Sequence, residues 1–374
     1  WQEPFLLLVC QLVLQCATVM ADDWPMVRGT QASSGVADSV FPDRLDVLWK
    51  YTVDDAAFEA TAVVHNGIAY IGDDDGTIHA LQLASGNPKW TRRLEETGFL
   101  AAAAVNNASV FAGDYNGRLW CLATSDGAER WSVDLEAECY AGPVLHKNSA
   151  LVTNEAGVLT SVNQTDGSEN WKYKIEAPLR CAPTVVAGRV LLAGCDQQLH
   201  IVDATNGNAV ATVEIDSQTG CTPAALGGRV FFGTESGTMF AIDVDRDDPD
   251  IAWTYRDPER GQSIRSAAAV EERIVVYGSQ GKAVYALDPQ TGDAKWTFPT
   301  KSRVEAGPVL AGDRVLIATA KGRLHLIDIA NGTEVWQYDA GGGFLASPTV
   351  VNGKLLIANA NGTLYCFRAR RSRE

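Results

Sequence analysis

The sequence is poor in histidine and methionine and lacks three common catalytic motifs. It contains five His and three Met among 374 residues, and no HExxH, no CxxC and no GxxxxGKS or GxxxxGKT motif occurs. These absences exclude the easily recognised metalloprotease, zinc-ribbon and P-loop classes. No stretch shows a sustained 3.6-residue period either, so a core built from helices is not expected.

Positive charge is also scarce. The chain has 31 Lys and Arg against 46 Asp and Glu, a formal net charge of -15. A chain this acidic repels phosphate backbones, and we therefore expect no nucleic-acid partner. Hydrophobic residues make up 46% and charged residues 21%, which is the balance of an ordinary globular protein.

The first residues are typical of an export signal. Residues 5–20 are apolar and almost uncharged, and Ala21 is followed by two aspartates. This pattern predicts a signal peptide over 1–21, truncated at its start because a basic stretch is missing, and export to the periplasm or beyond. The apolar run is too short to predict a membrane span. Lipidation and a buried N-terminal helix are the alternatives, although Gln15 before Cys16 does not fit a lipid-anchor motif.

Most of the remaining sequence is a repeat of about 40 residues. Its clearest marker is a tryptophan. One spacing between successive tryptophans is twice the usual length, and Ala211 stands at the position where the missing tryptophan is expected. A glycine in a short turn and a second turn such as TGDAKW or NGTEVW recur in phase. The repeat tryptophans are Trp49, Trp90, Trp131, Trp171, Trp253, Trp296 and Trp336.

One period shows four short strands. In residues 306–340, aliphatic runs at 309–310, 315–317 and 324–327 are separated by Gly-containing turns, and a fourth run begins at Val335. Four strands with turns every 8–12 residues are typical of a propeller blade. We therefore predict an all-β fold, an eight-bladed β-propeller of four-stranded antiparallel blades over residues 48–367.

The ends of the repeat predict how the ring closes. Trp49 has no strands of its own before it, and the eighth unit stops at Phe367 without a tryptophan. The strand around Trp49 is therefore expected to complete the last blade, which removes free sheet edges. Residues 22–47 form a leader segment and 368–374 a basic C-terminal tail. We expect a monomer, in which each Trp reaches the next blade.

The repeat pattern resembles that of a known family. The run from Ala286 to Trp296 is similar to the repeat of pyrroloquinoline-quinone-like (PQQ-like) propellers, and residues 23–36 resemble their exported leader. That family includes quinoprotein alcohol dehydrogenases and the outer-membrane assembly lipoprotein BamB. The resemblance implies either a non-catalytic scaffold that binds a protein or peptide of the cell envelope, or a periplasmic PQQ-dependent dehydrogenase. A small-ligand or carbohydrate-binding module is a third hypothesis.

The resemblance implies no catalytic residues here. Quinoprotein dehydrogenases carry adjacent cysteines over the cofactor, and this chain has none. We therefore expect no cofactor and no metal, with PQQ and calcium kept as the alternative. The acidic insertion at 245–250 is interpreted as a solvated loop or as a cation site. Cys181 and Cys195 form a disulfide or remain free thiols, because sequence alone does not decide pairing.

The mouth of the central channel is the predicted binding site. Three residues before the small or Pro residue that opens each inner strand, the repeats place a chemically mixed set, which we call the mouth ring: Glu59, Leu100, Tyr140, Arg180, Gly220, Arg265, Glu305 and Leu345. We predict that Glu59, Tyr140, Arg180, Arg265 and Glu305 grip a carboxylate or a peptide. The competing interpretation is that the Arg and Glu residues pair with one another across the rim.

Overall fold

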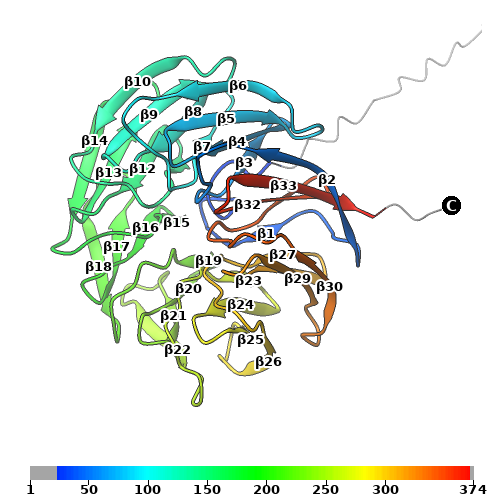
Figure 1. The fold of residues 1–374 in the computed structure, drawn as a ribbon. Coiled ribbons are helices and arrows are strands. Elements are labelled where there is room, and N and C mark those ends of the chain that lie inside the picture. Colours follow the sequence, from blue (N-terminus) through cyan, green and yellow to red (C-terminus); the bar gives the residue numbers. More distant parts are fainter. Residues whose placement is uncertain (1–22, 371–374) are drawn as a thin grey trace, which may run out of the picture.

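A computed structural model describes residues 23–370, and in this range the chain is built from strands, without helices. Eight sheets stand around a central axis as the blades of a propeller (Figure 1). The predicted all-β, eight-bladed fold is confirmed. No helix in the described range is long and apolar enough to cross a membrane. The predicted signal peptide lies outside the described residues.

Each blade has an inner, a second, a third and an outer strand, in antiparallel order. From blade 1 to blade 8, the inner strands are β3 (Val63–His65), β7 (Ala104–Val105), β11 (Val144–His146), β15 (Thr184–Val186), β19 (Ala224–Leu226), β23 (Ala269–Glu271), β27 (Val309–Ala311) and β31 (Thr349–Val351). The second strands are β4 (Ile68–Gly72), β8 (Ser109–Gly113), β12 (Ser149–Thr153), β16 (Arg189–Ala193), β20 (Arg229–Gly233), β24 (Ile274–Ser279), β28 (Arg314–Ala318) and β32 (Lys354–Asn359).

The third strands are β5 (Thr77–Gln82), β9 (Arg118–Ala123), β13 (Val158–Asn163), β17 (Gln198–Asp203), β21 (Met239–Asp243), β25 (Ala283–Leu287), β29 (Arg323–Asp328) and β33 (Thr363–Ala369). The outer strands are β6 (Pro88–Arg93), β10 (Glu129–Asp134), β14 (Glu169–Lys174), β18 (Ala209–Glu214), β22 (Asp250–Tyr255), β26 (Ala294–Pro299), β30 (Glu334–Asp339) and β2 (Leu45–Thr52). A two-residue strand, β1 (Val36–Ala37), runs parallel to β27.

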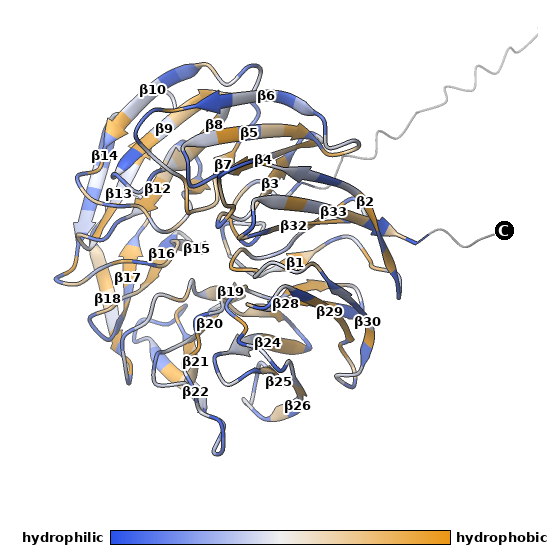
Figure 2. Cartoon of the chain, in the orientation of Figure 1, coloured by the Kyte–Doolittle hydropathy of each residue, from blue (hydrophilic) through white to orange (hydrophobic). Residues whose placement is uncertain are grey.

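Burial falls from the middle of each blade to its outer edge. The second and third strands are buried on both faces, whereas outer strands such as β10 and β14 are largely exposed. Figure 2 shows the corresponding change from apolar to hydrophilic colours toward the rim. Apolar residues on both faces of a strand are expected where each blade packs between two neighbours.

The ring closes between the two ends of the described chain. The N-terminal strand β2 pairs antiparallel with β33, and Trp49 lies opposite Cys366. Blade 8 therefore takes three strands from the end of the chain and its outer strand from the beginning. This closure by an N-terminal strand is the predicted one, and it leaves β33 without a free edge.

Residues 24–39, here called the axial segment, follow the inner strands around the channel. Backbone carbonyls of this segment accept the N–H of the second residue of the inner strand in blades 1, 2, 4, 5, 6 and 7, at 2.7–2.9 Å. Gln31 contacts His146 of blade 3, and Ser39 accepts the N–H of Gly353 in blade 8. Inner strands would otherwise present unpaired donors to the channel, so the segment satisfies backbone groups of seven blades and contacts a side chain of blade 3.

Neighbouring blades are joined by a repeated contact between tryptophan and glycine. A Cβ placed on Gly127 of blade 2 would lie 2.7 Å from Trp90 of blade 1, so only glycine lets the indole lie flat on the turn. The indole Nε1 of Trp90 also donates to the Thr124 carbonyl at 3.1 Å. The same packing joins Trp49 to Gly86, Trp131 to Gly167, Trp171 to Gly207, Trp253 to Gly292 and Trp296 to Gly332. We call each of these a Trp–Gly junction.

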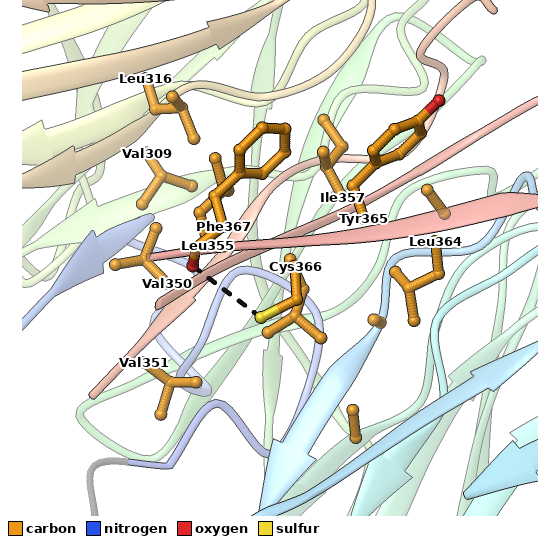
Figure 3. Packing of buried hydrophobic residues seen from close by; sticks show 14 of the residues in the cluster. Val309, Leu316, Val350, Val351, Leu355, Ile357, Leu364, Tyr365, Cys366 and Phe367 are labelled. Atoms are coloured by element: carbon orange, nitrogen blue, oxygen red, sulfur yellow. Dashed lines mark hydrogen bonds between the residues drawn. The ribbon is translucent and has the colours of Figure 1, made fainter. Parts of the chain in front are cut away.

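Two junctions depart from this pattern. Between blades 4 and 5, Ala211 stands in place of the tryptophan, and the Arg189 guanidinium donates to the Val244 carbonyl instead. Between blades 7 and 8 the glycine turn is missing, because the outer strand of blade 8 comes from the N-terminus. There Trp336 packs edge-on against Phe367, with ring centroids 5.9 Å apart. Figure 3 shows the apolar cluster around Phe367, with Val309 and Leu316 of blade 7 beside it.

A buried polar contact between blades was not predicted from the sequence. Tyr51 contacts the His79 Nδ1, and the Nε2 of the same ring contacts Asp73 at 2.8 Å. Tyr173, His200 and Asp196 repeat this arrangement at the junction of blades 3 and 4. Each tyrosine lies two residues after a repeat tryptophan, so the triad is a second bridge between neighbouring blades rather than part of the channel mouth.

Candidate functional site

The mouth ring lies on the face of the disc where the chain enters the inner strands. The turns between second and third strands lie on the same face because successive strands in a blade run antiparallel. Loops and turns of neighbouring blades therefore meet around the channel mouth. We call this side of the disc the mouth face. The opposite side, which carries the turns between inner and second strands and between third and outer strands, is called the hairpin face.

The two ring arginines pair with glutamates that the sequence prediction did not include. Arg180 Nε donates to Glu155 at 2.8 Å, and Arg265 Nε donates to Glu235 at 2.9 Å. Hydrogen bonding to Glu155 raises the pKa of Arg180. Both arginines remain more than half exposed, with side-chain exposures of 57%. Their partners lie in turns between second and third strands, not at Glu59 or Glu305 of the ring.

The paired glutamates carry a signal in the sequence. Glu155 and Glu235 each lie two residues before a marker glycine, Gly157 and Gly237. Both turns reach the mouth face next to the loop of the following blade. The contact joins residues of neighbouring blades, and finding it from sequence requires the turns as well as the ring to be aligned around the propeller.

Three shallow pockets bring most of the predicted residues together. Glu59, Tyr140 and Arg180 line a pocket of about 150 Å³ at the channel axis. Tyr140 and Arg180 also line a neighbouring pocket of about 400 Å³. Arg180 and Arg265 line a third, of about 290 Å³, in which the ring position between them is Gly220. Glu305 lies 3.6 Å from Arg303 at the equivalent place in blade 7.

Exposed apolar side chains lie among these charges. Tyr140 is 47% exposed and Leu345 is 39% exposed, and both line the axial pocket. Tyr115, in a turn of blade 2 on the same face, is 37% exposed. Aromatic and arginine side chains of this kind contribute most of the binding energy in protein interfaces. The mouth face therefore offers anchors for a partner as well as charged groups.

The cysteines provide neither a disulfide nor an evident nucleophile. The six cysteines of the described residues, Cys181 and Cys195 included, are free thiols. Burial raises the pKa of Cys181 to about 12 and also raises the pKa of Cys195. A thiol with a raised pKa is a poor nucleophile at neutral pH. Cys195 nevertheless lines the pocket between Arg180 and Arg265.

The acidic insertion of blade 5 lies on the hairpin face, away from the mouth ring. Asp243 pairs with Arg229 at 2.6 Å and with Arg246 at 2.8 Å, and Arg246 also pairs with Asp250 at 3.0 Å. Across residues 23–370, no three His, Cys, Asp or Glu side chains are grouped so as to hold a metal ion. In the described residues the insertion is thus organised by ion pairs between arginine and aspartate.

Comparison with protein families identifies the repeat. The family model described as "Outer membrane protein assembly factor BamB" matches residues 43–141, 74–220, 155–303 and 280–373, which together span nearly the whole described chain. The chain belongs to this family. The resemblance to PQQ-like propellers is confirmed by these matches. Among individually curated proteins, none matches the chain.

Solved structures similar to this chain include a BamB protein and alcohol dehydrogenases. BamB from Moraxella catarrhalis has a TM-score of 0.75 at 18% identity, covering 88% of this BamB-family chain and 99% of that one. Quinohemoprotein alcohol dehydrogenase from Comamonas testosteroni has a TM-score of 0.78 at 15% identity. The match covers 94% of this chain and 82% of the dehydrogenase. A europium-containing methanol dehydrogenase has a TM-score of 0.72 at 11% identity. The match covers 93% of this chain and 98% of the dehydrogenase. At these identities the likeness shows the fold alone.

Proposed function

We propose that this BamB-family propeller is an exported, non-catalytic scaffold that binds an extended segment of a partner protein during outer-membrane protein assembly. The observation that carries the proposal is the mouth face, where Tyr140 and Leu345 are exposed beside Arg180 and over adjoining shallow pockets. A row of small open pockets suits successive side chains of a peptide better than one enclosed small molecule. The family description supports the cellular role.

Charge on the mouth face favours a partner segment of mixed character. Arg180 and Arg265 are offset by Glu155 and Glu235, so these four residues together carry no net charge. A partner carboxylate can compete for either guanidinium, and a partner cation can bind the glutamate that is released. Exposed ion pairs contribute little by themselves, so the aromatic and aliphatic anchors are expected to dominate affinity.

Site-specific crosslinking in the native envelope tests the proposal. A photo-crosslinking amino acid is placed at Tyr140, and for comparison at Val210 of outer strand β18, because both positions are 47% exposed. We expect position 140, and not 210, to crosslink an outer-membrane assembly protein, and Leu345→Ala or Arg180→Glu to reduce that product several-fold. Equal products at both positions, or none at 140, would refute the scaffold proposal.

The quinoprotein dehydrogenase is the second candidate, because dehydrogenases share this fold at TM-scores above 0.7. It is tested by thermal unfolding with and without PQQ plus calcium, with calcium alone as the control. A ligand that binds only the folded state adds about 2.7 kcal/mol at a hundredfold excess over its dissociation constant. A clear rise in the unfolding midpoint would favour the dehydrogenase, and an unchanged midpoint the scaffold.

A further inference from the structure

A completely buried arginine lies on the axis of the propeller. Arg28 of the axial segment is 1% exposed, and its Nη2 donates to the carbonyls of Ala268 and Pro308, at 2.9 and 2.6 Å. Its Nε and Nη1 atoms are buried without a hydrogen-bond partner. Among the ion pairs of the described residues, none includes Arg28. Burial without a nearby carboxylate lowers the pKa of Arg28 to about 9, and the guanidinium stays charged at neutral pH.

The backbone around Arg28 is shaped to admit the guanidinium. A Cβ on Gly307 would lie 2.6 Å from Nη1, and a Cβ on Gly35 would overlap Nη2. The absence of a side chain at both positions thus makes room for the guanidinium. A buried charge without a counter-charge is strongly unfavourable, and an anion at the two unpartnered nitrogens would offset that cost.

A chain of hydrogen bonds leads from Gly307, which packs against the guanidinium, to two hydroxyl groups that can act as further donors. Ser347 Oγ accepts the N–H of Gly307 at 2.9 Å, and Thr61 Oγ1 accepts the N–H of Ser347 at 3.0 Å. Each hydroxyl acts as an acceptor in these bonds and retains one O–H to donate. Thr61, Ser347 and Val27, the neighbour of Arg28, line the axial pocket of about 150 Å³. The pocket thus joins hydroxyl donors to the segment that carries the buried cation.

We propose that the channel axis binds a small anion, a halide or a single carboxylate group, through the free Nε and Nη1 of Arg28 with help from Ser347 and Thr61. The site shares the axial pocket with the peptide surface proposed above, but its central group is buried beneath the mouth ring. Glu59 lines the same pocket and Arg180 there is already paired with Glu155, so Arg28 has to supply the positive charge of the site. An anion there also ties the axial segment to blades 6 and 7, through Arg28.

Thermal unfolding at constant ionic strength tests the proposal with defined probes. The unfolding midpoint is measured in sodium chloride, in sodium formate and in the salt of a morpholine sulfonate too bulky for the pocket. We expect the midpoint to rise with the logarithm of chloride or formate concentration, and the response to disappear in Arg28→Met. The control Arg303→Met removes an exposed arginine, 59% accessible, and should keep the response. Identical midpoints in the three salts would overturn the proposal.

Diffraction from the unmodified protein keeps the test independent of whether Arg28→Met folds. Crystals soaked in sodium bromide should show an anomalous peak within hydrogen-bonding distance of Arg28 Nη1 or Nε. A peak with bromide indicates a free inorganic anion. Density for formate at the same atoms, with no bromide peak, indicates a carboxylate, such as one supplied by a ligand. Water alone at both nitrogens in the two soaks would refute the anion site.

Discussion

The Trp–Gly junctions and the junction between blades 4 and 5 solve the same packing problem in different ways. At a Trp–Gly junction an indole covers the turn of the next blade and, in five of six cases, donates to its carbonyl. Between blades 4 and 5 the carbonyl of Val244 is bound by Arg189 instead. The hydrogen bond is kept while the aromatic surface is lost. Satisfying the turn carbonyl is therefore the more general requirement, and the indole adds apolar contact.

Blade 5 shows that the arginine and the tryptophan are compatible. Arg229 occupies in blade 5 the place of Arg189 in blade 4, and it donates to the Pro289 carbonyl at 3.0 Å. Trp253 donates to the same carbonyl at 3.1 Å. The junction between blades 5 and 6 therefore has two donors to the turn carbonyl, an arginine and a tryptophan, whereas the junction between blades 4 and 5 keeps only the arginine. The missing tryptophan coincides with the long acidic turn, since residues 244–249 replace the glycine turn on which an indole would lie.

Removing the N-terminal strand should have the largest effect, because the closing Trp–Gly junction depends on it. Deletion of residues 23–52 removes β2, Trp49 and the axial segment, leaving β33 as a free edge and the inner strands with unpaired donors. We expect the cooperative unfolding transition to disappear in calorimetry, with aggregation on size-exclusion chromatography. Replacing only residues 23–44 by a Gly-Ser linker preserves β2 and should leave a weaker transition. An unchanged transition in the deletion would show that closure is dispensable.

A single methyl group should break a Trp–Gly junction. Gly127 and Gly67 have nearly equal φ values of +73° and +72°, but a Cβ would meet Trp90 only at Gly127 and open space at Gly67. Gly67→Ala therefore measures the left-handed backbone cost, about 1–2 kcal/mol. Gly127→Ala should cost about 2 kcal/mol more in urea unfolding, because the indole is displaced. Equal losses for the two variants would show that the indole does not depend on the glycine.

The sequence predicted the blades because their markers are local. Each Trp and each turn glycine lies within one period, and the vacancy at Ala211 was visible from spacing alone. The axial segment was not predicted to line the channel because it has no repeat pattern and its hydrogen bonds reach inner strands throughout the chain. The partners of Arg180 and Arg265 were missed for a related reason, since Glu155 and Glu235 come from neighbouring blades. The binding role of the mouth ring stays a prediction.

Arg189→Met tests whether one hydrogen bond holds the junction that lacks tryptophan. The substitution keeps much of the aliphatic length but leaves the Val244 carbonyl without its charged donor. Such bonds contribute about 1.5–3 kcal/mol, and we expect a loss in the lower half of that range because Arg189 is partly exposed. Arg189→Lys retains a charged donor and should recover part of the loss in urea unfolding. A loss below about 0.5 kcal/mol would show that the apolar contacts suffice.

Rebuilding the missing junction should have the smallest effect and gives the sharpest comparison. Residues 244–249 are replaced by Pro-Gln-Thr-Gly, the turn that follows Asp288 in blade 6, and Ala211→Trp supplies the indole. Ala211→Trp alone should destabilise, because no glycine turn receives the ring, and the graft alone should be nearly neutral. The free energy of unfolding of the combined variant should be higher, by about 1–2 kcal/mol, than the sum of the two single effects predicts, which is within the range of coupled neighbours. Additive effects would mean that the indole and the glycine turn contribute independently, and that their joint absence in this junction is coincidental.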